Sequence, residues 1–136
     1  MKDKDLDRAV AAEKSIFRYG DNIEKIPNRF KKDKSVLIWL INRSHIILKF
    51  ADESLRKDKS VVLEAVKSLG MSLEYADQAC KKDKSIVLEA VKADWEVLEF
   101  ADESLKKDKS FIIKVVKECG SALKYAHPNL KKKINL

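Results

Sequence analysis

The sequence contains few residues that interrupt regular structure, with three glycines and two prolines among 136 residues. A fold rich in sheets needs more of both at its turns, so an all-α fold is favoured. There is also no uninterrupted apolar run of about 18 residues, and we expect no helix that spans a membrane. The first twenty residues carry charges where a signal peptide would be apolar. These absences predict a cytoplasmic protein.

Cysteine and histidine are equally scarce, with two of each. Cys80 and Cys119 occupy positions that hold leucine in other copies of the repeat described below, which predicts small buried hydrophobic side chains in a reducing compartment. His45 and His127 stand alone, without partners at a metal-ligand spacing. We find no nucleophile or phosphate-binding motif. The sequence therefore predicts no catalytic, cofactor-binding or metal-binding residues, and a protein that is not an enzyme.

What the sequence does contain is a tandem repeat. The string Lys/Arg-Lys-Asp-Lys-Ser recurs at 31–35, 56–60, 81–85 and 106–110, and a decayed copy follows at 131–135. Each step is 25 residues long. A fixed period of this length is typical of repeat proteins, in which each unit buries its apolar face against its neighbours.

Each unit has the pattern of two short helices. In the copy at 58–82, Asp58 is a predicted N-cap, and apolar residues follow at helical spacing up to Leu69. Gly70 is expected to end this helix with a positive φ. The second predicted helix carries its apolar side chains at Leu73, Tyr75, Ala76 and Cys80.

The chain as a whole is therefore predicted to be a single α-solenoid domain of about five helix-turn-helix units, with about ten helices. Residues 1–30 form a divergent N-terminal capping unit, residues 31–130 the tandem repeats and residues 131–136 a basic tail. The expected core positions of the first unit are Ile16, Phe17, Ile23, Ile26 and Phe30.

The phrase DKSVVLEAVKSLGMSLEYAD at 58–77 resembles the DUF4116 repeat family, which shows a similar D-x-x-V-V-L-x-A-V-x-x-x-G-x-A-L-x-Y-A-S pattern in tandem. The resemblance covers about residues 31–130. It departs from the pattern at His45 and Trp95, which replace the glycine. The resemblance implies a helical repeat domain without an assigned activity, and it carries over no catalytic residue.

Trp39 is a candidate anchor for a protein partner. Glu64, Glu89 and Lys114 fill its position in the other units, in the middle of the polar arc. An exposed aromatic side chain at such a place is typical of a binding surface, and Arg43 would share that surface. The alternative is that the first unit folds over Trp39 as part of the cap.

The lysines divide by position along the chain. The net charge is +5 over residues 1–50, −5 over residues 51–105 and +7 over residues 106–136, which sums to +7. In the middle, acidic residues stand four positions before basic ones, as in Glu53 and Lys57, a favourable helical spacing. The same spacing recurs in the pairs Asp52 and Arg56, Asp77 and Lys81, Asp102 and Lys106, and Glu103 and Lys107. The candidate anion-binding residues lie toward the C-terminus: Lys106, Lys107, Lys109, Lys114, Lys117, Lys124, Lys131, Lys132 and Lys133.

These observations predict a non-enzymatic helical-repeat scaffold that binds another macromolecule, most simply a protein, with a basic partner surface over the acidic central units. The alternative is binding of nucleic acid or another anionic surface through the basic terminal repeats. A third reading treats the array as a spacer within a longer polypeptide.

Overall fold

The computed structural model describes residues 27–134 other than Arg43 and His45, together with six positions between Lys4 and Lys14. Four predicted core positions of the first unit, at 16, 17, 23 and 26, and the tail residues 135–136 lie outside the described residues. Within the described part the protein has thirteen helices and no strand, and the all-α repeat fold is confirmed. The helices are α2 (Asn28–Lys31), α3 (Lys34–Ile41), α4 (Ile47–Phe50), α5 (Glu53–Lys57), α6 (Lys59–Ser68), η2 (Gly70–Tyr75), α7 (Gln78–Lys81), α8 (Lys84–Ala93), η3 (Trp95–Phe100), α9 (Glu103–Lys106), α10 (Lys109–Glu118), η4 (Gly120–Tyr125) and α11 (Pro128–Lys133).

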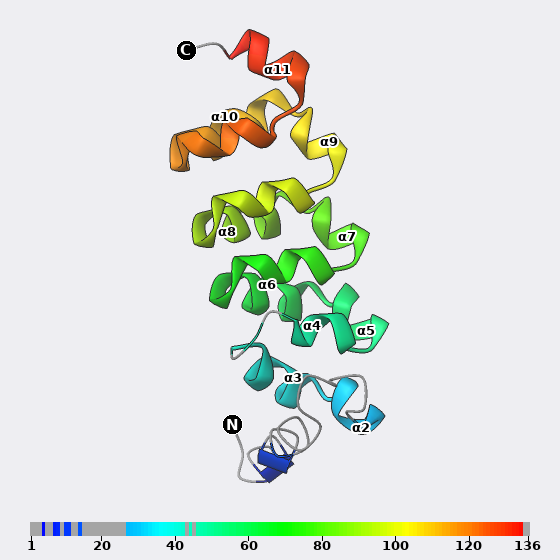
Figure 1. The fold of residues 1–136 in the computed structure, drawn as a ribbon. Helices are drawn as coiled ribbons and strands as arrows, with labels where there is room; N and C mark the ends of the chain where they lie inside the picture. Colours follow the sequence, from blue (N-terminus) through cyan, green and yellow to red (C-terminus); the bar gives the residue numbers. More distant parts are fainter. Residues whose placement is uncertain are drawn as a thin grey trace.

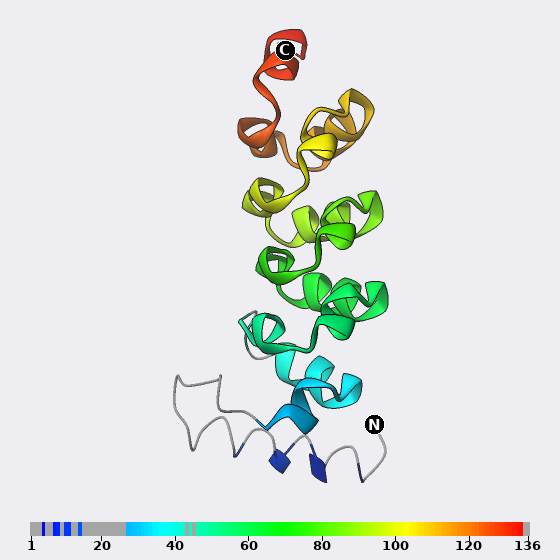
Figure 2. The same cartoon turned by 90° about the vertical axis from the view of Figure 1, so that its right-hand side faces the viewer.

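The helices form an elongated stack with α2 and α11 at opposite ends (Figure 1). The long helices α3, α6, α8 and α10 follow one another along the stack, one in each unit. The short helices α5, α7 and α9 lie along its other edge, and the view in Figure 2 shows the same succession of units. We refer to each unit by its long helix, so that α6, η2 and α7 form the α6 unit.

The second predicted helix of each unit is divided into two segments. In the α6 unit the 3₁₀-helix η2 ends before Ala76, and Ala76 and Asp77 are extended, with ψ angles of 153° and 154°. The backbone N–H of Asp77 donates to the carbonyl oxygen of Arg56 in the preceding unit at 3.1 Å. Since this bond is possible only where the chain leaves the helix, the break joins neighbouring units. It recurs in the bonds Asp52 to Lys31, Asp102 to Lys81 and His127 to Lys106.

Four of the five positions of the repeated string make contacts that recur from unit to unit. The carbonyl oxygen of the first basic residue accepts the inter-unit hydrogen bond just described. The aspartate is the N-cap of the long helix, and Asp58, for example, accepts from the backbone N–H groups of Ser60 and Val61. The serine hydroxyl of Ser60 also donates to Asp58, at 2.6 Å. The predicted N-cap is confirmed.

The third basic residue of the string forms an ion pair with the N-cap of the next unit. The distances are 3.0 Å for Lys34 to Asp58, 2.7 Å for Lys59 to Asp83 and 2.7 Å for Lys84 to Asp108. We call these three pairs the inter-unit ladder.

Of the ion pairs expected within single helices, the structure shows Glu53 to Lys57 at 2.6 Å. The side chains of Asp52, Asp77 and Asp102 instead cap α5, α7 and α9, because an aspartate directly before a helix satisfies its free N–H groups.

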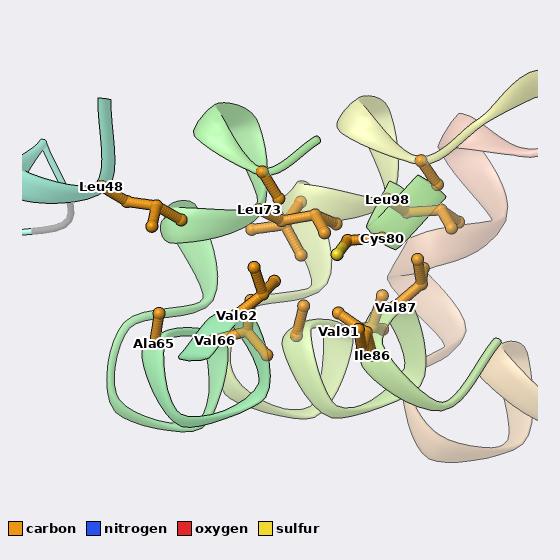
Figure 3. Close-up of a cluster of buried hydrophobic side chains, with 14 of the residues drawn as sticks. Leu48, Val62, Ala65, Val66, Leu73, Cys80, Ile86, Val87, Val91 and Leu98 are labelled. Carbon is orange, nitrogen blue, oxygen red and sulfur yellow. The ribbon is translucent and has the colours of Figure 1, made fainter. Parts of the chain in front are cut away.

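The core lies between the long helices and the segments that follow them (Figure 3). Val62, Val66 and Leu73 of the α6 unit are fully buried, and Val87 and Leu98 repeat this arrangement one unit later. Cys80 is also fully buried, as predicted. Cys119 is half-buried instead, because its position lies at the end of the long helix, where Leu69 of the α6 unit is half-buried too.

Gly70 has a role different from the predicted one. Its φ does not lie in the left-handed region, and α6 ends at the extended residue Leu69, with φ −140°. A Cβ atom on Gly70 would lie 2.7 Å from the carbonyl oxygen of Ala90. Glycine is therefore required because the backbone of α8 approaches closely. At Gly120 the same added atom would meet no other atom within 4 Å.

Candidate functional site

A groove of about 480 Å³ runs between α8 and α10. Its apolar lining comes from Leu88 of α8 and from Phe111 and Ile113 of α10. Its polar lining consists of Lys84, Ser85, Ser110, Lys114 and Lys117. Among the surface hollows that the structure describes, this one combines apolar side chains with the largest group of lysines, and we take it as the candidate site.

The stacking of the units places these residues together. Ser85 and Leu88 are three positions apart on α8, and Ser110 and Ile113 are their equivalents on α10, so the same stripe of each helix faces the groove. Leu88 and Ile113 are half-buried, whereas Phe111 is 3% exposed. The groove therefore has an apolar floor that solvent reaches.

The lysines of the groove differ in their partners. Lys84 belongs to the inter-unit ladder, and its ammonium group lies 2.7 Å from the Asp108 carboxylate at one end of the groove. That hydrogen bond, together with those from the Phe111 N–H and the Ser110 hydroxyl, lowers the pKa of Asp108 below its usual value. Lys114 and Lys117 are exposed, and in the described part of the chain no carboxylate forms an ion pair with either. These two lysines supply net positive charge to the rim.

The equivalent surface of the preceding units carries a different charge. The position of Lys114 is Glu89 in α8 and Glu64 in α6. Glu89 accepts from Lys92 at 3.0 Å, so the charge there is balanced by a neighbour on the same helix. The net charge of these two positions thus changes from zero at Glu89 and Lys92 on α8 to positive at Lys114 and Lys117 on α10.

The structure separates the nine predicted anion-binding lysines. Lys114 and Lys117 lie together in the groove. Lys106 is 15% exposed and donates to the backbone oxygen of Glu99 at 2.6 Å, so its amine is already occupied. The ammonium group of Lys124 lies 5.3 Å from the centre of the Tyr125 ring. The others lie outside the groove, with Lys107, Lys109, Lys132 and Lys133 exposed and Lys131 half-buried.

Trp39 is half-buried and packs against the hydrophobic core. Its expected companion Arg43 lies outside the described residues. The indole is therefore less open than an exposed anchor would be, and the role of Trp39 in binding stays a prediction.

Sequence reasoning missed the groove itself. The helical spacing of its apolar residues is the same as in the closely packed units, so the apolar pattern does not distinguish them. One available signal was the size of two side chains at contacts between units, namely Trp95 in place of the repeat's glycine and Phe111 in place of Val61 and Ile86.

Two classes of feature are missing from the described residues. In this part of the chain no group of three or more His, Cys, Asp or Glu side chains is arranged to hold a metal ion. None of its helices is both long and apolar enough to cross a membrane.

Comparison with known proteins gives one family. A family model described as "Domain of unknown function (DUF4116)" matches residues 12–56, 40–81 and 83–131. No curated protein and no solved structure matches the chain. The first match begins well before residue 31 and so reaches into the divergent N-terminal unit. Because the matched segments cover most of the sequence, the chain belongs to the DUF4116 family.

Proposed function

We propose that the protein is a non-enzymatic helical-repeat scaffold that binds another protein through the face formed by its long helices. The observation that carries this proposal is the groove between α8 and α10, in which solvent reaches an apolar floor beside two lysines without carboxylate partners. Concave surfaces with an apolar centre and a polar rim are typical of sites that recognise a partner.

The roles of the carboxylates support the non-enzymatic part of the proposal. Hydrogen bonds, first from the Ser60 hydroxyl and then from Lys34, lower the pKa of Asp58 to about 2. Those from Ser104 and Gln78 likewise lower the pKa of Asp102 to about 2. A carboxylate that caps a helix in this way is already bonded and ionised, whereas acid–base catalysis usually needs groups whose pKa values differ.

The free cysteines support a reducing compartment, which we propose to be the cytoplasm. Neither Cys80 nor Cys119 forms a disulfide, and burial is the main cause that raises the pKa of the Cys80 thiol. A thiol in that state is unreactive and serves packing.

The second candidate is binding of nucleic acid or another polyanion. It is favoured by Lys107, Lys109, Lys132 and Lys133, which are exposed in the last units. Lys109 occupies the ladder position, but Lys133 stands where earlier units have the accepting aspartate. Binding of this kind would weaken steeply with added salt.

One experiment tests both candidates. Immobilised full-length protein is exposed to nuclease-treated lysate of the source cell, beside a variant in which Lys114 and Lys117 are changed to Gln and a matched variant in which Lys107 and Lys109 are changed to Gln. A protein retained by the wild type and by the matched variant but lost from the groove variant supports the scaffold. Retention of nucleic acid from untreated lysate at low salt, with no such protein, would favour the alternative.

A further inference from the structure

The α8 and α10 helices pack less closely against each other than α6 and α8 do. The side chains at the contacts between units explain the difference. Gly70 lets the carbonyl oxygen of Ala90 approach so closely that even a Cβ atom would collide with it. Trp95 occupies the equivalent position one unit later and carries an indole ring. The α10 helix therefore cannot approach α8 as α8 approaches α6.

Two further contacts are consistent with Trp95 acting as a spacer. Its ring lies 5.9 Å from the ring of Tyr125, centre to centre, so it is held between the α8 and α10 units. A second hollow, lined by Trp95, Glu118 and Cys119 among others, lies where α8 and α10 end. The space between α8 and α10 is thus open in two places, at the groove and at the second hollow where the two helices end.

The groove has the dimensions of a helix-binding site. The α10 helix has ten residues and is about 15 Å long, enough to contact about three turns of an added helix. The apolar lining of the groove comes from Leu88 and Ile113, which are half-buried, and from Phe111, which is almost fully buried. A partner helix that places large apolar side chains at every third or fourth residue would bury them there.

Charge determines what should flank that apolar stripe. Lys114 and Lys117 stand on α10 one turn apart, which matches acidic residues on one side of a bound helix. On the α8 side, Glu89 is paired with Lys92, and at the end of the groove Asp108 is paired with Lys84. Among the described charges of the groove, the two lysines are therefore those without an ion-pair partner, and they favour an acidic ligand.

We propose that the α8–α10 groove binds an amphipathic helix with leucine-like side chains on one face and acidic residues beside them, and that Trp95 is the spacer that keeps the groove open. This proposal rests on the proposed scaffold function and names the chemistry of its partner. The preceding pair of units, closed by Gly70 and carrying Glu64 and Glu89, does not bind such a helix.

The probe is a fluorescent peptide of about 14 residues, four helical turns, with leucine on one face and glutamate beside it. Binding to the full-length protein is followed by fluorescence anisotropy. One control peptide has lysine in place of glutamate, and a second has alanine in place of leucine. We expect saturable binding of the first peptide and at least about tenfold weaker binding of both controls, because each lacks one of the two matching features.

Three variants locate the site, each chosen for a stated reason. Lys114→Glu introduces the residue found at this position in α6 and α8, and it should weaken binding about tenfold. Lys67→Glu makes the same charge change at the α6 equivalent of Lys117, outside the groove, and should leave binding within about twofold. Trp95→Gly introduces the glycine of the α6 unit and should abolish measurable binding by letting α10 close on α8.

A second apolar variant protects the test against misfolding. If circular dichroism shows that Trp95→Gly has lost helix content, Leu88→Ser takes its place, and we expect at least tenfold weaker binding from it. Equal effects of Lys114→Glu and Lys67→Glu would overturn the proposal, as would tight binding of the lysine-bearing peptide. A single-stranded oligonucleotide would also overturn the proposal if it displaced the probe and if its own affinity for the protein were unchanged by Leu88→Ser.

The outcome for the groove is separable from that for the scaffold. If the lysate experiment identifies a protein partner but the glutamate peptide does not bind, the scaffold stands and the helix-binding groove is wrong. If the peptide binds as expected but no protein partner is retained, the groove stands as a peptide site and the proposed scaffold function fails.

Discussion

The ammonium group of Lys59 lies 2.7 Å from the carboxylate of Asp83, the residue that caps the long helix of the following unit. One aspartate thus fixes the start of its own helix and holds the preceding unit. The pair is partly exposed, with 65% of the lysine side chain and 20% of the aspartate side chain accessible. Solvent weakens such a pair, so the cap should contribute more than the ion pair does.

The first prediction separates these two roles. Asp83→Ala should lower the free energy of unfolding by about 1–2 kcal/mol, because the cap of α8 is lost. Lys59→Met should lower it by less, since it removes the exposed ion pair alone. Urea unfolding followed by circular dichroism measures both. In the double variant the free energy of unfolding should fall by nearly the same amount as in Asp83→Ala, because Lys59 then has no carboxylate to pair with. A much larger fall in the double variant would show that Lys59 does not act through Asp83.

The second prediction concerns acid. The pKa of Asp58 and that of Asp102 are each lowered from the usual 3.8 to about 2. A lowered pKa in the folded protein means that the unfolded chain binds protons first, so stability falls as pH drops. We expect the contribution to be complete above about pH 5 and to be lost between about pH 4 and pH 2. With Asp58→Asn, the urea concentration at the midpoint of unfolding should change less steeply with pH in this range. An unchanged slope of that midpoint against pH would contradict the assignment.

The third prediction contrasts two glycines. Gly70→Ala should destabilise the protein by about 1–3 kcal/mol, because its Cβ atom would lie 2.7 Å from a backbone oxygen that has little room to move. Gly120→Ala is the matched control, with no other atom within 4 Å of the added carbon. It should be neutral or stabilising by up to about 1 kcal/mol, since alanine restricts the unfolded chain. Similar thermal shifts for the two variants would be incompatible with the close approach of α8.

The fourth prediction concerns a buried hydroxyl. Ser72 is fully buried, and among the described residues its Oγ atom has no hydrogen-bond partner. Ile47, Val97 and Ala122 fill the same position in other units. Burying an unsatisfied hydroxyl is costly, so Ser72→Ala should raise the free energy of unfolding by about 1 kcal/mol. Differential scanning calorimetry measures the change, and a lower melting temperature would indicate that the hydroxyl has a bound water or other partner.

The period and the helix starts were predictable because both are local features of the sequence. Asp58 and Asp83 stand directly before apolar residues at helical spacing, and a side chain that caps the next turn needs no other part of the chain. The break before Asp77 was equally local, since Ala-Asp precedes a further helix in three units and Ala-His does so in the last. The break was missed because the apolar residues before and after it keep nearly the spacing of one continuous helix.

The contacts between units could not be predicted in this way. The pairing of Lys84 with Asp108 joins residues 24 positions apart and depends on how far apart the helices stack. The need for glycine at position 70 and the effect of tryptophan at position 95 both depend on this stacking distance between the helices of neighbouring units. The groove is a property of that spacing, which the apolar pattern of a single unit does not reveal.

The inter-unit ladder also constrains how this chain changes during evolution. Because each pair joins residues 24 positions apart, duplication or loss of one 25-residue unit brings an equivalent lysine opposite an equivalent aspartate. An insertion or deletion of any other length inside a unit shifts one partner of the pair and the backbone bond beside it. Gain and loss of whole units should therefore be the tolerated route by which relatives come to differ in length.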